Sequence, residues 1–241
     1  MINPDALSNL PTFLSLKPAT IQHIARLAQV VSLNAGELLY RQGAPPTGLF
    51  ALQEGRIKLY RQSRGRVQIL AILMPGDGFG AESFSTGAPS PCAATALTAV
   101  SAIHIPPDAL GQLLSAHADF QELLLELVTN RLKQFVTLVH DLAFRDVTSR
   151  LATVLILRAE VEGQPSDEGI VFDRLLSQQE FADMVGTARE VVYRTFKRFE
   201  EDGLVRMTRS TILIQDLDTL RSIASKKPVK PPDICKTNHP M

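Results

Sequence analysis

Hydrophobic and polar residues change their spacing along the chain, and the changes mark three regions, one of strands and two of helix. Between Leu33 and Ile105, short apolar segments are separated by glycines, which is typical of the strands of a roll or barrel. Before this region, Thr20 to Val31 has apolar residues at helical spacing. After it, Asp119 to Leu142 contains no Gly or Pro, and it predicts one helix of about 36 Å.

Alternation with a period of two marks individual strands within the glycine-rich region. It is clearest from Arg56 to Tyr60 and from Thr98 to Ile105, where the apolar residues fall largely at every second position. The segment Leu49 to Leu52, followed by Glu54-Gly55 and then by the Arg56 segment, predicts a β-hairpin.

The long predicted helix carries two apolar faces. One face repeats at intervals of three and four residues, as in a heptad seam. Its members are Leu125, Val128, Leu132, Phe135, Val139 and Leu142. The other face comprises Leu123, Leu124, Leu127, Val136 and Leu138. A helix with two such faces is too apolar to stand in water, so we expect the second face to pack on its own domain and the seam to meet a second copy.

A second helix is predicted from Asp146 to Glu162, and a loop rich in Gly, Pro and acidic residues follows it. The last residues are rich in proline and lysine and bury nothing, which predicts a disordered tail. We therefore expect a sensor-like domain over 1–118, a dimerisation helix and hinge over 119–145, a third domain over 146–220, and the tail over 221–241.

Two closely spaced helix starts follow in the third domain. Ser177 and Glu180 form one capping box, Gly186 ends that helix, and Thr187 with Glu190 predicts a second capping box. Two short capped helices joined by a glycine turn indicate a helix-turn-helix, whose second helix enters the major groove of DNA.

Arg189, Glu190 and Arg194 lie on one side of the second helix and are the predicted readers of DNA bases. The segment Leu204 to Ile214 predicts a β-hairpin that would serve as a wing on DNA phosphates. The remaining predicted DNA contacts are Ser177, Gln179, Thr187, Arg206 and Arg209.

Composition narrows the function classes. The 25 basic residues balance 25 acidic ones, so affinity for DNA must come from local clusters. Two cysteines, Cys92 and Cys235, cannot build a multi-cysteine metal site, the histidines lack metal spacing, and no catalytic motif occurs, so we expect neither a metal site nor an enzyme. Because charges or prolines interrupt every apolar stretch, we expect a cytoplasmic protein without a membrane span.

The stretches Leu142 to Leu151 and Val185 to Arg194 resemble the hinge and the recognition segment of the Crp/Fnr family of bacterial transcription regulators. The resemblance extends from about residue 10 to 220 and implies an α+β fold: a cyclic-nucleotide-binding-like β-roll (jelly roll), a dimerisation helix and a winged helix-turn-helix. It further implies a homodimer that binds double-stranded DNA at near-palindromic promoter sites. Arg189, Glu190 and Arg194 would read TGTGA-like half-sites, with RNA polymerase as a partner.

The sequence departs from the cyclic-AMP-responsive members of that family where the ligand would bind. Ser90-Pro91 replaces the Arg-Ser pair that holds the cyclic phosphate, so no positive charge is expected there. Glu82 is one place away from the family's glutamate, and Phe135 and Val136 take the positions of the adenine contacts. We therefore expect DNA binding without cyclic AMP. The alternative is a redox sensor using Cys92, or a sensor of haem or another small molecule, and the effector stays open.

Overall fold

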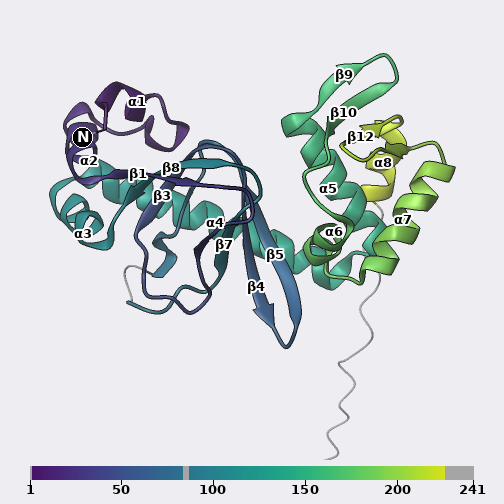
Figure 1. Cartoon of the computed structure of the whole chain (residues 1–241), viewed down its shortest axis with the longest axis horizontal. Helices are drawn as coiled ribbons and strands as arrows, with labels where there is room; N and C mark the ends of the chain where they lie inside the picture. Colours follow the sequence, from purple (N-terminus) through teal and green to yellow (C-terminus); the bar gives the residue numbers. More distant parts are fainter. Residues whose placement is uncertain (1, 84–86, 226–241) are drawn as a thin grey trace, which may run out of the picture. The chain divides into compact units, whose positions relative to one another are not determined.

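The computed structural model describes residues 2–83 and 87–225 and is shown in Figure 1. The chain forms two compact units, 1–135 and 136–241, and the boundary between them falls within the long helix Ala118–Phe144. In the described residues, no helix is both long enough and apolar enough to cross a membrane.

The first unit is a β-roll of two antiparallel sheets with helices at its beginning and end. One sheet has the order β1 (Gln29–Leu33), β8 (Val100–Ile105), β3 (Leu49–Glu54) and β6 (Gly78–Phe79). The other has the order β2 (Leu38–Tyr40), β7 (Ala93–Ala96), β4 (Ile57–Ser63) and β5 (Arg66–Leu73). The helical elements are α1 (Pro4–Ser8), η1 (Pro11–Phe13), α2 (Pro18–Leu27), η2 (Ala81–Ser83) and α3 (Pro107–Ala116).

The roll has two apolar clusters, one between its sheets and one beneath its helices. Leu52, Leu59 and Phe79 belong to the first cluster, and Phe13, Ile24 and Phe120 belong to the second. The second cluster joins the terminal helices and the first turns of the long helix to the β1–β8–β3–β6 sheet. The beginning of the long helix is therefore part of the roll.

Two predictions about the roll are wrong. The segments β3 and β4 do not form a hairpin, because β3 pairs with β8 and β6, whereas β4 pairs with β5 and β7 in the other sheet. Gly55, with φ +87°, carries the chain from one sheet to the other, and a Cβ there would lie 2.1 Å from the carbonyl oxygen of Ala99. The helix predicted to reach Val31 ends at Leu27, because the next residues pair with β8 as strand β1.

The long helix α4 (Ala118–Phe144) confirms the prediction for Asp119 to Leu142. Leu123 is buried, and Leu124 and Leu127 pack partly buried against the core of the roll, as expected of the second face. Val136 was assigned to that face but is 62% exposed, so this assignment is wrong. It lies beyond the last turn of α4 that belongs to the roll unit, so the core has ended before it.

The predicted seam of α4 is open to solvent in the single chain. Leu125, Val128, Leu132 and Val139 are between 43% and 68% exposed, whereas Phe135 and Leu142 are partly buried. Exposing a row of large apolar side chains to water costs free energy. This face is therefore expected to be covered by a partner surface.

In its described residues, the second unit packs four helices and a small sheet around one core, beyond the end of the long helix. Its elements are α5 (Val147–Glu162), β9 (Gln164–Ser166), β10 (Gly169–Asp173), α6 (Gln178–Val185), α7 (Arg189–Glu201), β11 (Val205–Met207), β12 (Thr211–Ile214) and α8 (Leu217–Ala224). The sheet order is β11–β12–β10–β9. The hairpin β11–β12 confirms the strand pair predicted between Leu204 and Ile214. Helix α5 begins as predicted, because the Asp146 side chain accepts from the Ser149 amide.

The predicted tail starts too early. Residues 221–224 form the last turn of α8, which buries Leu220 and joins α5 through an Arg221–Glu160 ion pair of 3.1 Å. Contacts with another helix order this short segment, which has two polar and two apolar residues. Ser225 caps the end of this helix, and residues 226–241 of the predicted tail lie outside the described residues.

The end of α4 is fixed to α5 and α8 by two arginines. The Nη1 atom of Arg150 donates to the carbonyl oxygens of Asp141, Leu142 and Arg145 at 3.3, 3.3 and 2.7 Å. Arg145 donates to the carbonyl oxygen of Ala224 and to Thr153 Oγ1. The Arg150 bonds supply side-chain donors to carbonyls at the end of α4, where backbone partners run out, and the Arg145 bonds join the same end to α5 and α8. The last turn of α4 is therefore held within the second unit.

Candidate nucleic-acid interface

Helix α6 and the turn after it are fixed by local hydrogen bonds. The Ser177 hydroxyl accepts from the amide of Glu180, and the Glu180 carboxylate accepts from the amide of Ser177, so the first capping box is confirmed. Gly186 ends the helix with φ +67° and ψ +50°, the left-handed conformation that glycine adopts without steric cost. Its amide and that of Thr187 both donate to the carbonyl oxygen of Ala182.

The second predicted capping box is wrong. Helix α7 begins at Arg189, its N-cap is Ala188, and no side chain caps it. The Thr187 amide closes the end of α6, so this residue belongs to the turn and cannot also start α7. As a result, Arg189 and Glu190 occupy the first turn of α7.

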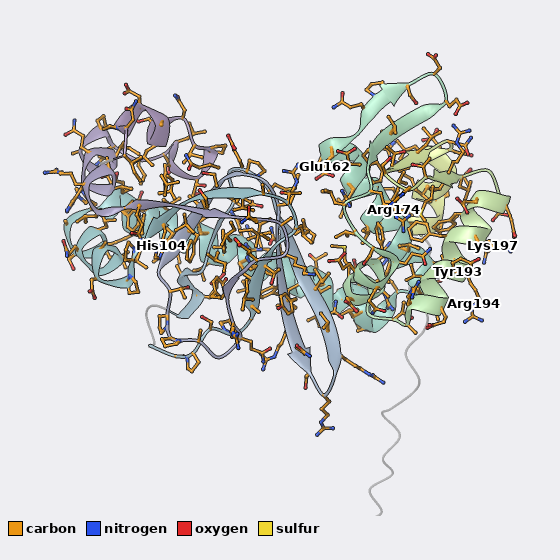
Figure 2. All side chains as sticks on the ribbon, viewed as in Figure 1. His104, Glu162, Arg174, Tyr193, Arg194 and Lys197 are labelled. Carbon is orange, nitrogen blue, oxygen red and sulfur yellow. The ribbon has the colours of Figure 1, made fainter. Side chains whose placement is uncertain are left out.

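Helix α7 separates an apolar face from a polar one. Val192, Phe196 and Phe199 are buried, and the ring of Phe196 meets that of Phe181 on α6 edge to face, with centroids 5.2 Å apart. These contacts fix how α7 is presented on α6. The exposed face consists of Arg189, Glu190, Tyr193, Arg194 and Lys197, and Figure 2 labels the last three along α7.

Charged residues in the two halves of α7 differ in their partners. In the C-terminal half, Lys197 pairs with Glu201 at 4.0 Å, and Arg198 pairs with Asp202 at 3.6 Å. In the N-terminal half, Arg189, Glu190, Tyr193 and Arg194 make no side-chain hydrogen bond or ion pair with the part of the chain that the structure describes. These exposed donors and acceptors can therefore bind an external polar partner without breaking an internal bond.

The other predicted contacts on α6 and its turn have internal bonds. The Ser177 hydroxyl donates to Glu180 as part of the cap, and Gln179 Nε2 donates to Asp183 Oδ1 at 2.7 Å. Thr187 is half-buried in the turn. Thr187 directly precedes the first turn of α7, whereas Ser177 and Gln179 are bonded within α6 and have less capacity for a ligand than the side chains of α7.

On the wing, Arg206 is paired with Glu168 of the β9–β10 turn, and Arg209 is exposed in the β11–β12 turn. Sequence reasoning missed Arg174, which lies just before α6 and contacts this turn. Its amide donates to the carbonyl oxygen of Ser210 at 2.7 Å, and its Nη1 donates to that of Thr208 at 3.1 Å. An arginine three residues before a capping box was the only available signal. Tyr193 was also missed, although it follows Glu190 by three residues.

Around Ser90, the described part of the roll offers few free hydrogen-bond donors. Ser90 is buried, its amide donates to the carbonyl oxygen of Ala44 at 2.7 Å, and Pro91 has no amide to donate. The nearby cavity, lined by Phe79, Glu82 and Arg131 among others, measures about 10 Å³. A volume of that size holds about one water molecule. A larger, open hollow of about 580 Å³ adjoins this cavity at Arg131. The small cavity by itself cannot hold a cyclic nucleotide.

Arg131 corrects the expectation that no positive charge remains in this part of the roll. The residue comes from α4, is buried, and lines the cavity together with Glu82. Its Nη1 donates to Gln134 Oε1 at 2.8 Å. Its position depends on how α4 packs on the roll, so the local sequence around Ser90 gave no sign of it.

The proposed redox role of Cys92 loses its physical basis. The side chain is 3% exposed, and burial, together with the negative charge of Glu82, raises the pKa of the thiol to about 11. The thiolate is the reactive form, so a thiol with this pKa reacts slowly near neutral pH.

His104, labelled in Figure 2, is engaged through both ring nitrogens. Nε2 lies 2.6 Å from the carbonyl oxygen of Thr47, Nδ1 lies 3.1 Å from Gln29 Nε2, and the ring stacks on Phe50. His23 and His117 face each other with 2.9 Å between Nδ1 and Nε2. A haem or metal that took one of these nitrogens as a ligand would have to replace an existing hydrogen bond.

A β-roll followed by a long helix and a winged helix-turn-helix defines a DNA-binding transcription regulator. Residues 30–117 match the cyclic nucleotide-binding domain, and residues 149–223 match the Crp-like helix-turn-helix domain. The chain belongs to the Crp/Fnr family, whose members are transcription regulators and not enzymes.

Individual relatives agree with this assignment. The chain is 29% identical to the CRP-like cAMP-activated global transcriptional regulator of Mycobacterium tuberculosis, over 90% of this chain and 97% of the relative. It is 26% identical to the transcriptional activator protein Anr of Pseudomonas aeruginosa, over 85% of this chain and 86% of the relative. Its fold is similar to that of a Crp/Fnr family regulator from Thermus thermophilus, with a TM-score of 0.71 and 22% identity over 83% of this chain and all of that one.

Proposed function

We propose that this chain regulates transcription as a homodimer that reads near-palindromic promoter DNA through the N-terminal half of α7. The observation that supports the proposal is the group of exposed polar side chains on this half of α7, which form no hydrogen bond or ion pair with the described part of the chain. An arginine can donate two hydrogen bonds to guanine, and a glutamate can accept one from the cytosine amino group. Arg189, Glu190 and Arg194 therefore suit TGTGA-like half-sites, and Tyr193 adds an aromatic contact beside them.

The exposed seam of α4 supports the homodimer. A two-fold axis along this helix would present two copies of α7 to half-sites about 34 Å apart, one turn of DNA. Near-palindromic sites follow from that symmetry. A regulator of this kind acts on promoter DNA in the cytoplasm, with RNA polymerase as its partner.

Selection of bound sequences from random duplex DNA tests the DNA-reading proposal. We expect a two-fold symmetric motif. Arg189→Ala and Arg194→Ala should each cost about 1 to 3 kcal/mol on the selected site and relax the preference at one base position. Arg198→Ala is the matched control, because Arg198 lies on the same helix but pairs with Asp202. Equal losses on selected and random duplexes would instead make Arg189 and Arg194 phosphate contacts.

We also propose that DNA binding does not require cyclic AMP. Burying the charged cyclic phosphate needs several donors or cations. Only Arg131 offers a cation among the residues that line the small cavity. By resemblance to the family, Phe135 and Val136 place apolar groups at the positions of the adenine contacts.

Calorimetry with cyclic AMP, together with DNA binding by ligand-free protein, tests this independence. We expect no heat of binding and full affinity for the selected site. Micromolar binding of cyclic AMP would overturn the argument from the cavity. DNA affinity that appears only with the nucleotide would overturn the independence and align this chain with the cAMP-activated relative.

A further inference from the structure

The hairpin formed by β4 and β5 concentrates positive charge in a chain that is neutral overall. Between Glu54 and Asp77 there is no acidic residue, whereas five basic residues occur. They are Arg56, Lys58, Arg61, Arg64 and Arg66. Residues 61–66, at the tip of the hairpin, are all exposed. Figure 1 shows this hairpin extending from the roll.

The tip is held in a defined shape. Strands β4 and β5 pair down to Ser63 and Arg66, and Arg64 and Gly65, with φ +49° and +77°, form the two-residue turn between them. Positive φ at both turn residues is typical of tight hairpins. The backbone of Arg64 is in the left-handed region, which residues with a Cβ rarely adopt. The pairing of the strands on both sides of the turn holds Arg64 in this conformation.

The register brings two of the arginines onto one face. Arg61 pairs with Gln68, and Ser63 pairs with Arg66, so Arg61 and Arg66 are diagonal neighbours on the same side of the hairpin, about 7 to 8 Å apart. Like charges at this separation repel each other. Within the described residues, Arg61, Arg64 and Arg66 form no ion pair with an acidic side chain; Arg61 donates only to the carbonyl oxygen of Pro91, at 3.4 Å.

Protection of an exposed sheet edge does not account for this pattern. Strand β5 is the edge of its sheet, and charges that protect an edge lie along the edge strand itself. Here Arg66 occupies the first position of β5, and the rest of that strand, Val67 to Leu73, carries no charge. The charge is gathered at the tip instead.

We propose that Arg61, Arg64 and Arg66 form an arm that contacts the phosphate backbone of DNA outside the half-sites read by α7. This inference rests on the proposed DNA-binding function. Guanidinium groups bind phosphate through two parallel hydrogen bonds. Such contacts need positively charged side chains that extend to the DNA backbone, but they need no apolar surface. The tip offers no apolar surface, since its other residues are Gln62, Ser63 and Gly65. An acidic protein partner would need apolar or aromatic groups for the core of its interface.

The test compares two duplexes that carry the selected site, one without and one with about 15 base pairs of random sequence on each side. The variant R64Q/R66Q removes two charges from the tip and leaves the Arg61 bond to Pro91 in place. The matched control K17Q/R26Q removes two charges from exposed positions on and just before α2, in the same unit.

We expect R64Q/R66Q to bind the short duplex as the wild type does and to lose several-fold affinity on the long one. On the long duplex, the slope of log affinity against log salt should become shallower by about 0.9 for each phosphate that the variant no longer neutralises. The control variant should match the wild type on both duplexes.

Each other result has a distinct meaning. Unchanged affinity and salt slope of R64Q/R66Q on the long duplex would overturn the arm, and equal losses on both duplexes would place its contacts inside the half-sites. Unchanged DNA binding with impaired activation of transcription would assign the tip to an acidic protein and overturn the DNA contact. A wild-type chain that binds neither duplex would mean that the proposed function has failed, separately from the arm.

Discussion

Leu132 is the sharpest test of the α4 seam, because it lies at the centre of the exposed row. The side chain is 61% exposed in the single chain. Covering that surface should contribute about 1 to 2 kcal/mol, since full burial of a leucine is worth about 1.5 to 3 kcal/mol. A two-fold dimer contains the position twice, so Leu132→Ala should cost about 2 to 4 kcal/mol of dimer stability. That range corresponds to roughly a 30-fold to 1,000-fold higher dissociation constant.

Leu132→Glu should have a larger effect, because it also brings two carboxylates together in a surface that excludes water. We expect monomers at micromolar concentration in sedimentation velocity and weak binding to the selected site. The control is Leu157→Glu on α5, where the leucine is 55% exposed but lies outside the seam. This variant should stay dimeric.

A Leu132→Glu chain that sediments as the wild-type dimer would refute the seam. Circular dichroism and thermal unfolding of the same sample establish whether the monomer is folded. A folded monomer supports the interface, whereas an unfolded chain leaves the decision to Leu132→Ala, whose dissociation constant should still rise at least tenfold.

Three further predictions concern single side chains. Ser177→Ala removes the cap of α6 and should lower the free energy of unfolding by about 1 kcal/mol in urea titrations, and an unchanged midpoint would make the Glu180 carboxylate the sufficient cap. Burial and the neighbouring His117 lower the pKa of His23 below 6.5, so the folded chain binds this proton less readily than the unfolded chain. Stability should therefore fall as the pH drops below 6.5, and His23→Gln should weaken this dependence in thermal unfolding between about pH 5 and 8. In a C235S background, iodoacetamide should modify Cys92 far more slowly in the folded chain than in urea, and equal rates would contradict the raised pKa of this thiol.

Features that depend on neighbours within a few residues could be predicted from the sequence. The capping box of Ser177 and Glu180 joins atoms three residues apart, the end of α6 needs only Gly186 in the left-handed conformation, and α5 begins where Asp146 caps it. The exposed seam of α4 follows from a repeat of three and four residues along one helix. In each case the interacting atoms are close along the chain, so their identity and spacing suffice.

Features that depend on distant segments were decided by the tertiary structure. Alternation identified β3 and β4 as strands but could not show that they enter different sheets, because strand pairing is set by residues far along the chain. From the sequence, the Thr187 amide could bond at the end of α6 or at the start of α7. Only the structure shows that it donates to the carbonyl oxygen of Ala182 and so belongs to the end of α6. Arg131 is 41 residues from Ser90, and the packing of α4 on the roll brings its charge into the cavity. Local sequence thus determined the elements and their faces, whereas long-range packing determined which side chains share a site.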